Sequence, residues 1–94
     1  MYKIEFKKSV KKDFKHIDKT DILFIRDSLK EFAKNFSNSY ELSLMQNGKI
    51  KKLKSQSEEL YRLRLRSYRV IYQKFSDKLV ILVLRVTTRE NAYK

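Results

Sequence analysis

Residues 60–88 read LYRLRLRSYRVIYQKFSDKLVILVLRVTT, and this stretch decides the fold. Apolar and basic side chains alternate strictly from Leu60 to Arg66, which predicts a strand with one buried face. Residues 68–75 are rich in β-formers and predict a second strand. Residues 79–86 are nearly all aliphatic, as in a central strand covered on both faces. The connections between these strands are short, so we expect antiparallel neighbours joined by tight turns.

The N-terminal half predicts one strand and two helices. Side chains alternate between apolar and charged over residues 2–7, as in a half-buried strand. Ser9 is a candidate cap for a short helix that ends at about Ile17, and Asp18 and Thr20 are candidate caps for a longer helix. The longer helix carries an apolar stripe at helical spacing, formed by Ile22, Ile25, Leu29, Phe32, Ala33 and Phe36.

The segments between these halves are polar. We expect residues 37–47 to form a loop or a frayed helix end, and residues 55–59 to form a second loop. The expected order is therefore strand, helix, helix, then three or four antiparallel strands. This is an α+β fold with helices packed on a twisted sheet. At 94 residues the chain forms one domain, spanning residues 1–94.

Composition excludes several classes of protein. The chain has no cysteine, which excludes a disulfide-stapled scaffold and a thiolate metal site. No signal-peptide h-region is present, and the longest apolar run, residues 79–84, is too short to span a bilayer. We therefore expect a cytoplasmic protein without a membrane partner. Basic residues clustered without a carboxylate pair or a His/Asp/Glu set argue against metal-dependent and glycosidase chemistry, so we expect no metal and no cofactor.

The charge is strongly positive and unevenly distributed. Twenty-three basic and eleven acidic residues give a net charge of +12. Residues 1–47 contribute ten basic and seven acidic side chains, whereas residues 48–94 contribute thirteen basic and four acidic. A surplus concentrated in one half is typical of a basic face that binds phosphate backbones or an acidic partner. The alternative is a generally basic protein whose lysines only maintain solubility.

The alternation predicts a cluster of guanidinium groups. Arg62, Arg64 and Arg66 should share one face of their strand at intervals of about 6 to 7 Å, close to the spacing of neighbouring phosphates. Arg69 opens the next strand, so four arginines converge on one patch. Like charges repel, and a fold gathers them where a polyanion binds. The alternative is an ordinary solvated sheet face.

The run LKSQSEELYRLRLRSYRVIYQKFSDKLVILVLRVTTRENAY (residues 53–93) closely resembles the C-terminal half of RelE/ParE superfamily toxins. The preceding strand and helices fit as well, so the resemblance covers essentially the whole chain. Members of this superfamily show a Leu-x-Gly step, a strand of alternating basic and apolar residues, a Tyr-Arg-x-x-Tyr strand, a hydrophobic strand, and a late Arg followed by a Tyr. The matching positions are Leu53, Arg62, Arg64, Tyr68, Arg69, Tyr72, Arg89 and Tyr93.

The resemblance implies a ribosome-dependent mRNA endonuclease that a cognate antitoxin holds inactive. It implies that the scissile phosphate is surrounded by the catalytic residues Arg62, Arg64, Arg69, Arg89 and Tyr93. Arginines suit the negative charge that develops when a ribose 2′-OH attacks the adjacent phosphate. Arginine is a poor base, so Tyr93 is the candidate for proton exchange, and Tyr61 or Tyr93 is a candidate for stacking on an mRNA base. We expect further nucleic-acid contacts from Lys52, Lys54, Tyr61 and Arg66.

The sequence departs from the family pattern at three places. Ser55 replaces the usual glycine, the turn before the Tyr-Arg strand is reduced to Ser67, and Thr88 stands where many relatives have His or Lys. The lone His16 is interpreted as a surface residue away from the arginines. Two other functions remain open: inhibition of DNA gyrase, as in the ParE branch, and a non-catalytic module that binds nucleic acid or antitoxin.

Overall fold

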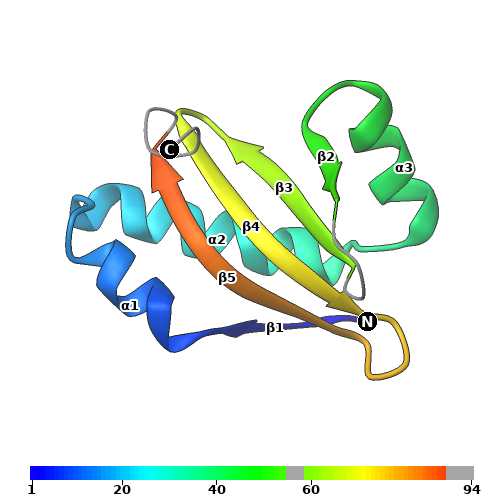
Figure 1. The fold of residues 1–94 in the computed structure, drawn as a ribbon, viewed down its shortest axis with the longest axis horizontal. Helices are drawn as coiled ribbons and strands as arrows, with labels where there is room; N and C mark the ends of the chain where they lie inside the picture. Colours follow the sequence, from blue (N-terminus) through cyan, green and yellow to red (C-terminus); the bar gives the residue numbers. More distant parts are fainter. Residues whose placement is uncertain (55–58, 89–94) are drawn as a thin grey trace.

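The computed structural model describes residues 1–54 and 59–88 as one α+β unit (Figure 1). The elements follow in the order β1 (Lys3–Phe6), α1 (Lys8–Phe14), α2 (Lys19–Lys34), α3 (Asn38–Gln46), β2 (Ile50–Leu53), β3 (Leu60–Leu65), β4 (Tyr68–Phe75) and β5 (Val80–Thr88). The predicted α+β class is confirmed. None of the described helices is long and apolar enough to cross a lipid bilayer.

The strands form one sheet in the order β1-β5-β4-β3-β2. Strands β2 to β5 are antiparallel neighbours, as expected, and the basic segment after Gly48 supplies β2. β1 pairs with β5 in the parallel direction, so the first and last strands lie side by side. Ile71 pairs with Arg85 and Tyr72 with Val83, which leaves Leu84 as an extra residue in a β-bulge.

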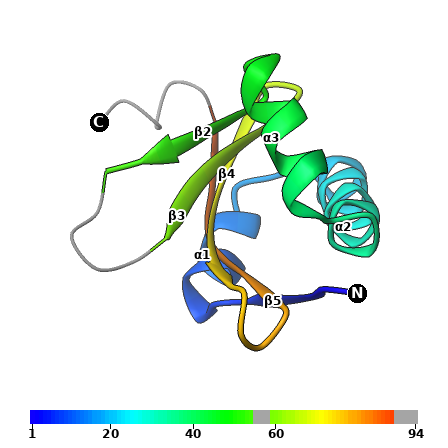
Figure 2. The ribbon, with the colours of Figure 1, turned by 90° about the vertical axis from the view of Figure 1, so that its right-hand side faces the viewer.

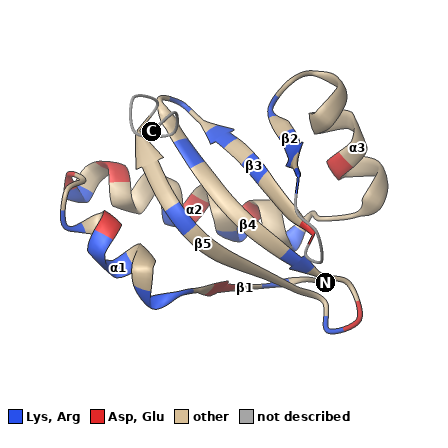
Figure 3. Cartoon of the chain, in the orientation of Figure 1, with Lys and Arg blue, Asp and Glu red and all other residues tan. Residues whose placement is uncertain are grey.

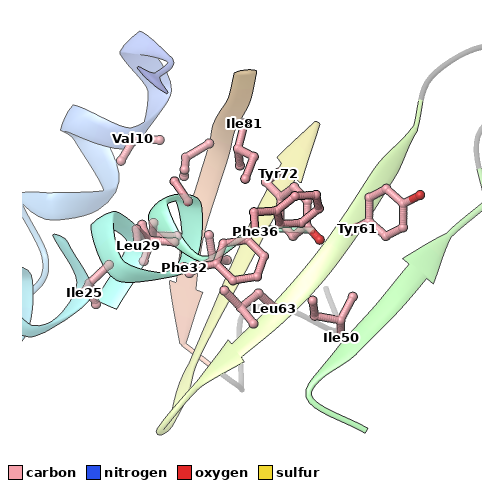
Figure 4. Close-up of a cluster of buried hydrophobic side chains, with 14 residues drawn as sticks. Val10, Ile25, Leu29, Phe32, Phe36, Ile50, Tyr61, Leu63, Tyr72 and Ile81 are labelled. Atoms are coloured by element: carbon pink, nitrogen blue, oxygen red, sulfur yellow. The ribbon is translucent and has the colours of Figure 1, made fainter. Parts of the chain in front are cut away.

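Helices α2 and α3 lie on one face of the sheet, as Figure 2 shows. The apolar stripe of α2 packs there against the strands: Ile25 and Leu29 are fully buried, and the Phe32 ring meets the Tyr72 ring edge-on at 5.5 Å. Figure 4 shows these side chains in the core. The buried apolar residues are Val10, Ile25, Leu29, Phe32, Ala33, Phe36, Ile50, Tyr61, Leu63, Val70, Tyr72, Ile81, Val83 and Val86.

The expectation of a loop or frayed helix end over residues 37–47 was wrong, because residues 38–46 form α3. The Ser37 side chain caps this helix by accepting a hydrogen bond from the Tyr40 N–H at 3.1 Å. Gly48 ends it with a left-handed φ of 86°, which glycine adopts without steric cost. α3 lacks a strong apolar stripe, so its position depends on contacts with the sheet.

A buried polar cluster joins α3 to β4. The Glu41 carboxylate accepts a hydrogen bond from the Tyr72 hydroxyl at 2.7 Å and pairs with the Lys74 ammonium at 2.8 Å. Only 6% of the Glu41 side chain and 9% of the Lys74 side chain are exposed. Burial and the hydrogen bond to Glu41 raise the pKa of Tyr72. Burial alone would lower the pKa of Lys74, but the hydrogen bond and the charge of Glu41 outweigh it and raise that pKa.

Three local expectations need correction. Ser9 does not cap α1, which begins after Lys7; its hydroxyl donates instead to the carbonyl of Leu84 in the β5 bulge at 2.6 Å. α1 ends at Phe14, before the expected Ile17. The aliphatic strand β5 is not buried on both faces, since Leu82 and other residues of its second face are only half-buried.

Candidate nucleic-acid interface

Basic residues occur on four adjacent strands of the sheet, β2 to β5 (Figure 3). Directly opposite residues of paired strands lie on the same face, so the register defines rows across the sheet. The first row runs from Lys51 on β2 through Arg62 on β3 and Ile71 on β4 to Arg85 on β5. Tyr61 and Tyr72 are buried in the core on the other face, so this row lies on the face of the sheet away from α2 and α3.

A second row lies one step along the strands. Arg64 on β3 is directly opposite Arg69 on β4, which is opposite Thr87 on β5. Side chains so paired have Cβ atoms about 4.5–5.5 Å apart, and like charges directly opposite each other are destabilising. Rows on one face repeat at about 6–7 Å along a strand. The residues Lys51, Arg62, Arg64, Arg69 and Arg85 are called the arginine surface below.

The members of this surface differ in exposure. Arg64 and Arg85 are exposed, Arg62 is half-buried, and Arg69 is 6% exposed. Within residues 1–54 and 59–88 the ion pairs are Lys74–Glu41 and Arg85–Asp13, so no carboxylate in that part of the chain pairs with Arg62 or Arg64. Cations with so few neighbouring carboxylates to balance their charge favour an anionic ligand. The spacing between the rows suits the phosphates of a nucleic-acid strand.

Arg85 is held in place from α1. The Asp13 carboxylate accepts hydrogen bonds from Arg85 Nε at 3.0 Å and Arg85 Nη2 at 3.1 Å. It also accepts one from the Val86 N–H at 2.8 Å. The hydrogen bonds and the negative charge of Asp13 raise the pKa of Arg85. This contact ties α1 to the edge of β5 and fixes the orientation of one guanidinium of the arginine surface.

Arg66 does not share this face, contrary to the prediction. β3 ends at Leu65, and Arg66 lies in the turn with a φ of 55°. Its guanidinium carbon lies 3.7 Å from the centre of the Phe24 ring on α2, on the helix side of the sheet. The short connection through Ser67 forces the chain to turn here, which breaks the alternation one residue early.

Two more predicted nucleic-acid contacts are placed elsewhere. Tyr61 is 4% exposed and stacks on Tyr72 with ring centroids 5.3 Å apart, so it is a core residue and its ring is closed to an RNA base. Lys52 is directly opposite Tyr61 and therefore lies on the face of the sheet that the helices cover. Lys54 is exposed just beyond the end of β2.

The register brings together Arg62, Arg64 and Arg69 as predicted, and it adds two residues that the sequence did not indicate. Lys51 joins because it is opposite Arg62, and strand pairing is not visible in the sequence. Arg85 joins because Leu84 is an extra residue in the bulge, which places Arg85 on the face of the sheet opposite to Val83. The predicted residues Arg89 and Tyr93 lie outside the described residues.

Comparisons with known proteins find similar sequences and similar folds. Residues 4–93 match the model of a family described as the ParE toxin of the type II toxin–antitoxin system parDE. The putative toxin RelE1 of Methanocaldococcus jannaschii is 28% identical over 93 residues, covering 99% of this chain and 96% of that protein.

Solved structures resemble the whole fold. One is a chain of the archaeal RelE–RelB complex from Pyrococcus horikoshii OT3, with a TM-score of 0.62, 29% identity and 94% of each chain covered. Another is a chain of the RelB–RelE antitoxin–toxin complex from Methanococcus jannaschii, with a TM-score of 0.67 and 26% identity. It covers 96% of this chain and 95% of that one.

Proposed function

Because the chain belongs to the family of ParE toxins of type II toxin–antitoxin systems and is RelE-like in fold, we propose that it is a toxin that cleaves messenger RNA on the ribosome. The observation that supports this proposal is the direct opposition of Arg64 and Arg69 beside Arg62 on the sheet face away from α2 and α3. Such an arrangement is unfavourable without an anion and becomes favourable when a phosphate lies between the guanidiniums. Action on translated messages implies a cytoplasmic location.

The proposed reaction needs little from the protein except charge and position. The ribose 2′-oxygen attacks its own 3′-phosphate, forms a 2′,3′-cyclic phosphate and displaces the 5′-oxygen of the next nucleotide. Arg62, Arg64 and Arg69 stabilise the charge that develops on the non-bridging oxygens. We propose Arg89 as a further phosphate ligand and Tyr93 as the group that exchanges a proton. With no strong base on the arginine surface, the chain depends on the ribosome to align the message.

The partner proposed for the free toxin is a cognate antitoxin. The two archaeal structures above are complexes of RelE with RelB, and the net charge of this chain suits a partner with acidic side chains. A partner that covers the arginine surface should bind less tightly to an Arg62→Glu/Arg64→Glu variant. Unchanged affinity in calorimetry would place the antitoxin on another surface.

Expression without a partner tests the activity. Wild-type protein should arrest bacterial growth, and primer extension in a translation extract should map new mRNA ends within translated codons. Arg62→Ala/Arg64→Ala should abolish both effects. The matched control is Lys30→Ala/Lys34→Ala, which removes two positive charges from exposed positions on α2. If both double variants lose toxicity equally, net charge rather than the arginine surface is responsible.

A second candidate function is inhibition of DNA gyrase, which the match to the ParE family model favours. Growth arrest without mRNA cleavage, together with loss of supercoiling by gyrase in vitro, would select it. Rapid cleavage of naked RNA at nanomolar protein would instead contradict the dependence on the ribosome.

A further inference from the structure

A hollow lies beside the arginine surface, between α1 and the second half of β5. Its volume is about 240 Å³. It is lined on one side by Asp13, His16 and Ile17 and on the other by residues 85–88 of β5. The lining is mixed in character: it offers a cation, an imidazole and two threonine hydroxyls next to aliphatic side chains. Such a combination is typical of a pocket that orients a small polar ligand.

The hollow is continuous with both rows of the arginine surface. Arg85 is the β5 member of the row that contains Arg62, and Thr87 is the β5 member of the row that contains Arg64 and Arg69. A ligand that follows either row across the sheet therefore reaches the hollow at the edge of β5. Since the rows suit phosphates, the same strand of nucleic acid would bring its next nucleotide to this place.

Arg85 is prepared for a phosphate in the hollow. Asp13 uses the Nε and Nη2 donors of the guanidinium, and within residues 1–54 and 59–88 the Nη1 donor makes no hydrogen bond. The side chain remains 55% exposed. Asp13 is itself occupied by Arg85 and by the Val86 N–H, so its charge is largely compensated. The ion pair thus fixes the guanidinium plane and leaves one nitrogen for an incoming oxygen.

His16 is the second polar group of the hollow that can contact a ligand. It is the single histidine of the chain, it follows the end of α1, and it is exposed on the wall of the hollow. An imidazole stacks on a nucleobase or exchanges hydrogen bonds with a base edge or a ribose hydroxyl. The sequence pattern placed His16 away from the arginines. The structure brings it to the same hollow as Arg85 because Asp13 anchors the last turn of α1 to β5.

We propose that the hollow between α1 and β5 is a second nucleotide-binding subsite, in which Arg85 binds a backbone phosphate and His16 contacts the base or ribose of single-stranded RNA. This inference rests on the proposed RNA-cleaving function and extends it to a nucleotide neighbouring the scissile phosphate. A hollow of about 240 Å³ lies below the ~300 Å³ of pockets that enclose drug-sized ligands, so we expect it to hold no more than one nucleotide unit.

The single histidine allows a direct test without substitutions. The imidazole Cε1 proton of His16 gives one resolved NMR signal, which is followed while a 2′-O-methylated RNA hexamer is added to the purified protein. The methylated sugar prevents cleavage during the titration. The subsite predicts a saturable shift of the His16 signal over the concentration range in which fluorescence anisotropy detects binding. A His16 signal that stays fixed while the RNA binds would overturn the subsite.

Variants then separate the subsite from the rest of the surface. Arg85→Gln should weaken hexamer binding about threefold to tenfold and reduce the salt dependence by about one phosphate contact. The control Lys15→Gln removes one charge from the neighbour of His16 that does not line the hollow. An equal effect of both variants would reduce the result to net charge and overturn the proposal. Circular dichroism confirms that each variant is folded.

The outcomes distinguish the subsite from the function on which it rests. If Arg62→Ala/Arg64→Ala abolishes mRNA cleavage while Arg85→Gln leaves hexamer affinity and the His16 signal shift intact, the subsite fails and the proposed function stands. If the wild-type protein neither binds the hexamer nor cleaves mRNA on ribosomes, both fail. A shifted His16 signal that disappears in Arg85→Gln, together with an unaffected Lys15→Gln control, supports the subsite.

Discussion

Replacing Glu41 with alanine should destabilise the protein strongly, because this carboxylate is the buried partner of two polar groups. The change leaves the Lys74 ammonium and the Tyr72 hydroxyl without their acceptor. Removing one member of a buried ion pair typically costs 3–5 kcal/mol. The flexible lysine chain can carry its ammonium toward water, so we expect about 3 kcal/mol, at the lower end of that range. For a domain of this size that loss corresponds to a fall in Tm of roughly 12–24 °C.

The assay is thermal and urea unfolding followed by far-ultraviolet circular dichroism. Glu31→Ala is the matched control, since Glu31 is exposed on α2. Its carboxylate accepts one long hydrogen bond, of 3.4 Å, from the side-chain amide of Asn35. Its effect should stay within about 0.5 kcal/mol. Two results would refute the reasoning: a loss below about 1 kcal/mol for Glu41→Ala, or equal losses for Glu41→Ala and Glu31→Ala.

A second comparison isolates the physical cause. The triple variant Glu41→Met/Tyr72→Phe/Lys74→Met removes all three polar groups and keeps similar volumes. Replacing a complete buried ionic cluster with apolar side chains is often neutral or stabilising. The triple variant should therefore recover most of the stability that Glu41→Ala loses. Failure to recover would mean that α3 needs the ion pair itself, beyond the cost of an orphaned charge.

Three further experiments test the raised pKa values, the position of Arg66 and the proposed role of Tyr93. The free energy of unfolding should be constant from about pH 8 to 10 and fall at higher pH. The pKa values of Tyr72 and Lys74 are raised in the folded state, so the folded protein keeps protons that the unfolded chain releases above the ordinary pKa values of 10.0 and 10.5. Urea titrations at successive pH values measure this free energy, and a rise in stability above pH 10 would contradict the prediction. Arg66→Ala should cost about 0.5–1 kcal/mol through loss of the contact with Phe24, yet leave RNA cleavage unchanged; a tenfold loss of cleavage would return Arg66 to the interface. Tyr93→Phe should bind ribosomes normally but cleave at least tenfold more slowly, which single-turnover cleavage on ribosomes checks; a Phe variant with full activity alongside an inactive Ala variant would assign Tyr93 to stacking.

The parts of the fold that local pattern controls were predictable. The alternation around Leu63 and the aliphatic run around Val83 predicted β3 and β5, which are both antiparallel to β4 between them, and the stripe of α2 predicted the helix that covers them. α3 was missed because it is held by a tertiary contact. Its Glu41 reaches Tyr72 on a distant strand, and no local apolar period marks the helix.

The candidate site was predictable only where alternation persists. Arg62 and Arg64 lie on one face because β3 is regular between them, whereas Arg66 leaves that face at the turn. Arg85 was missed because a single extra residue in β5 shifts the parity of everything after it. Bulges and strand registers depend on the partner strand, so the residue pattern of a single segment does not predict them.

The pairing of β1 with β5 sets the timing of folding during synthesis. Hydrogen bonds from the first helix to the last strand, such as Ser9 to Leu84, join residues 75 positions apart. The N-terminal segments therefore emerge from the ribosome long before the strand that completes their sheet exists. The arginine surface also assembles late, since its rows need β4 and β5. We expect the nascent chain to lack the arginine surface until β5 has emerged and paired with β4.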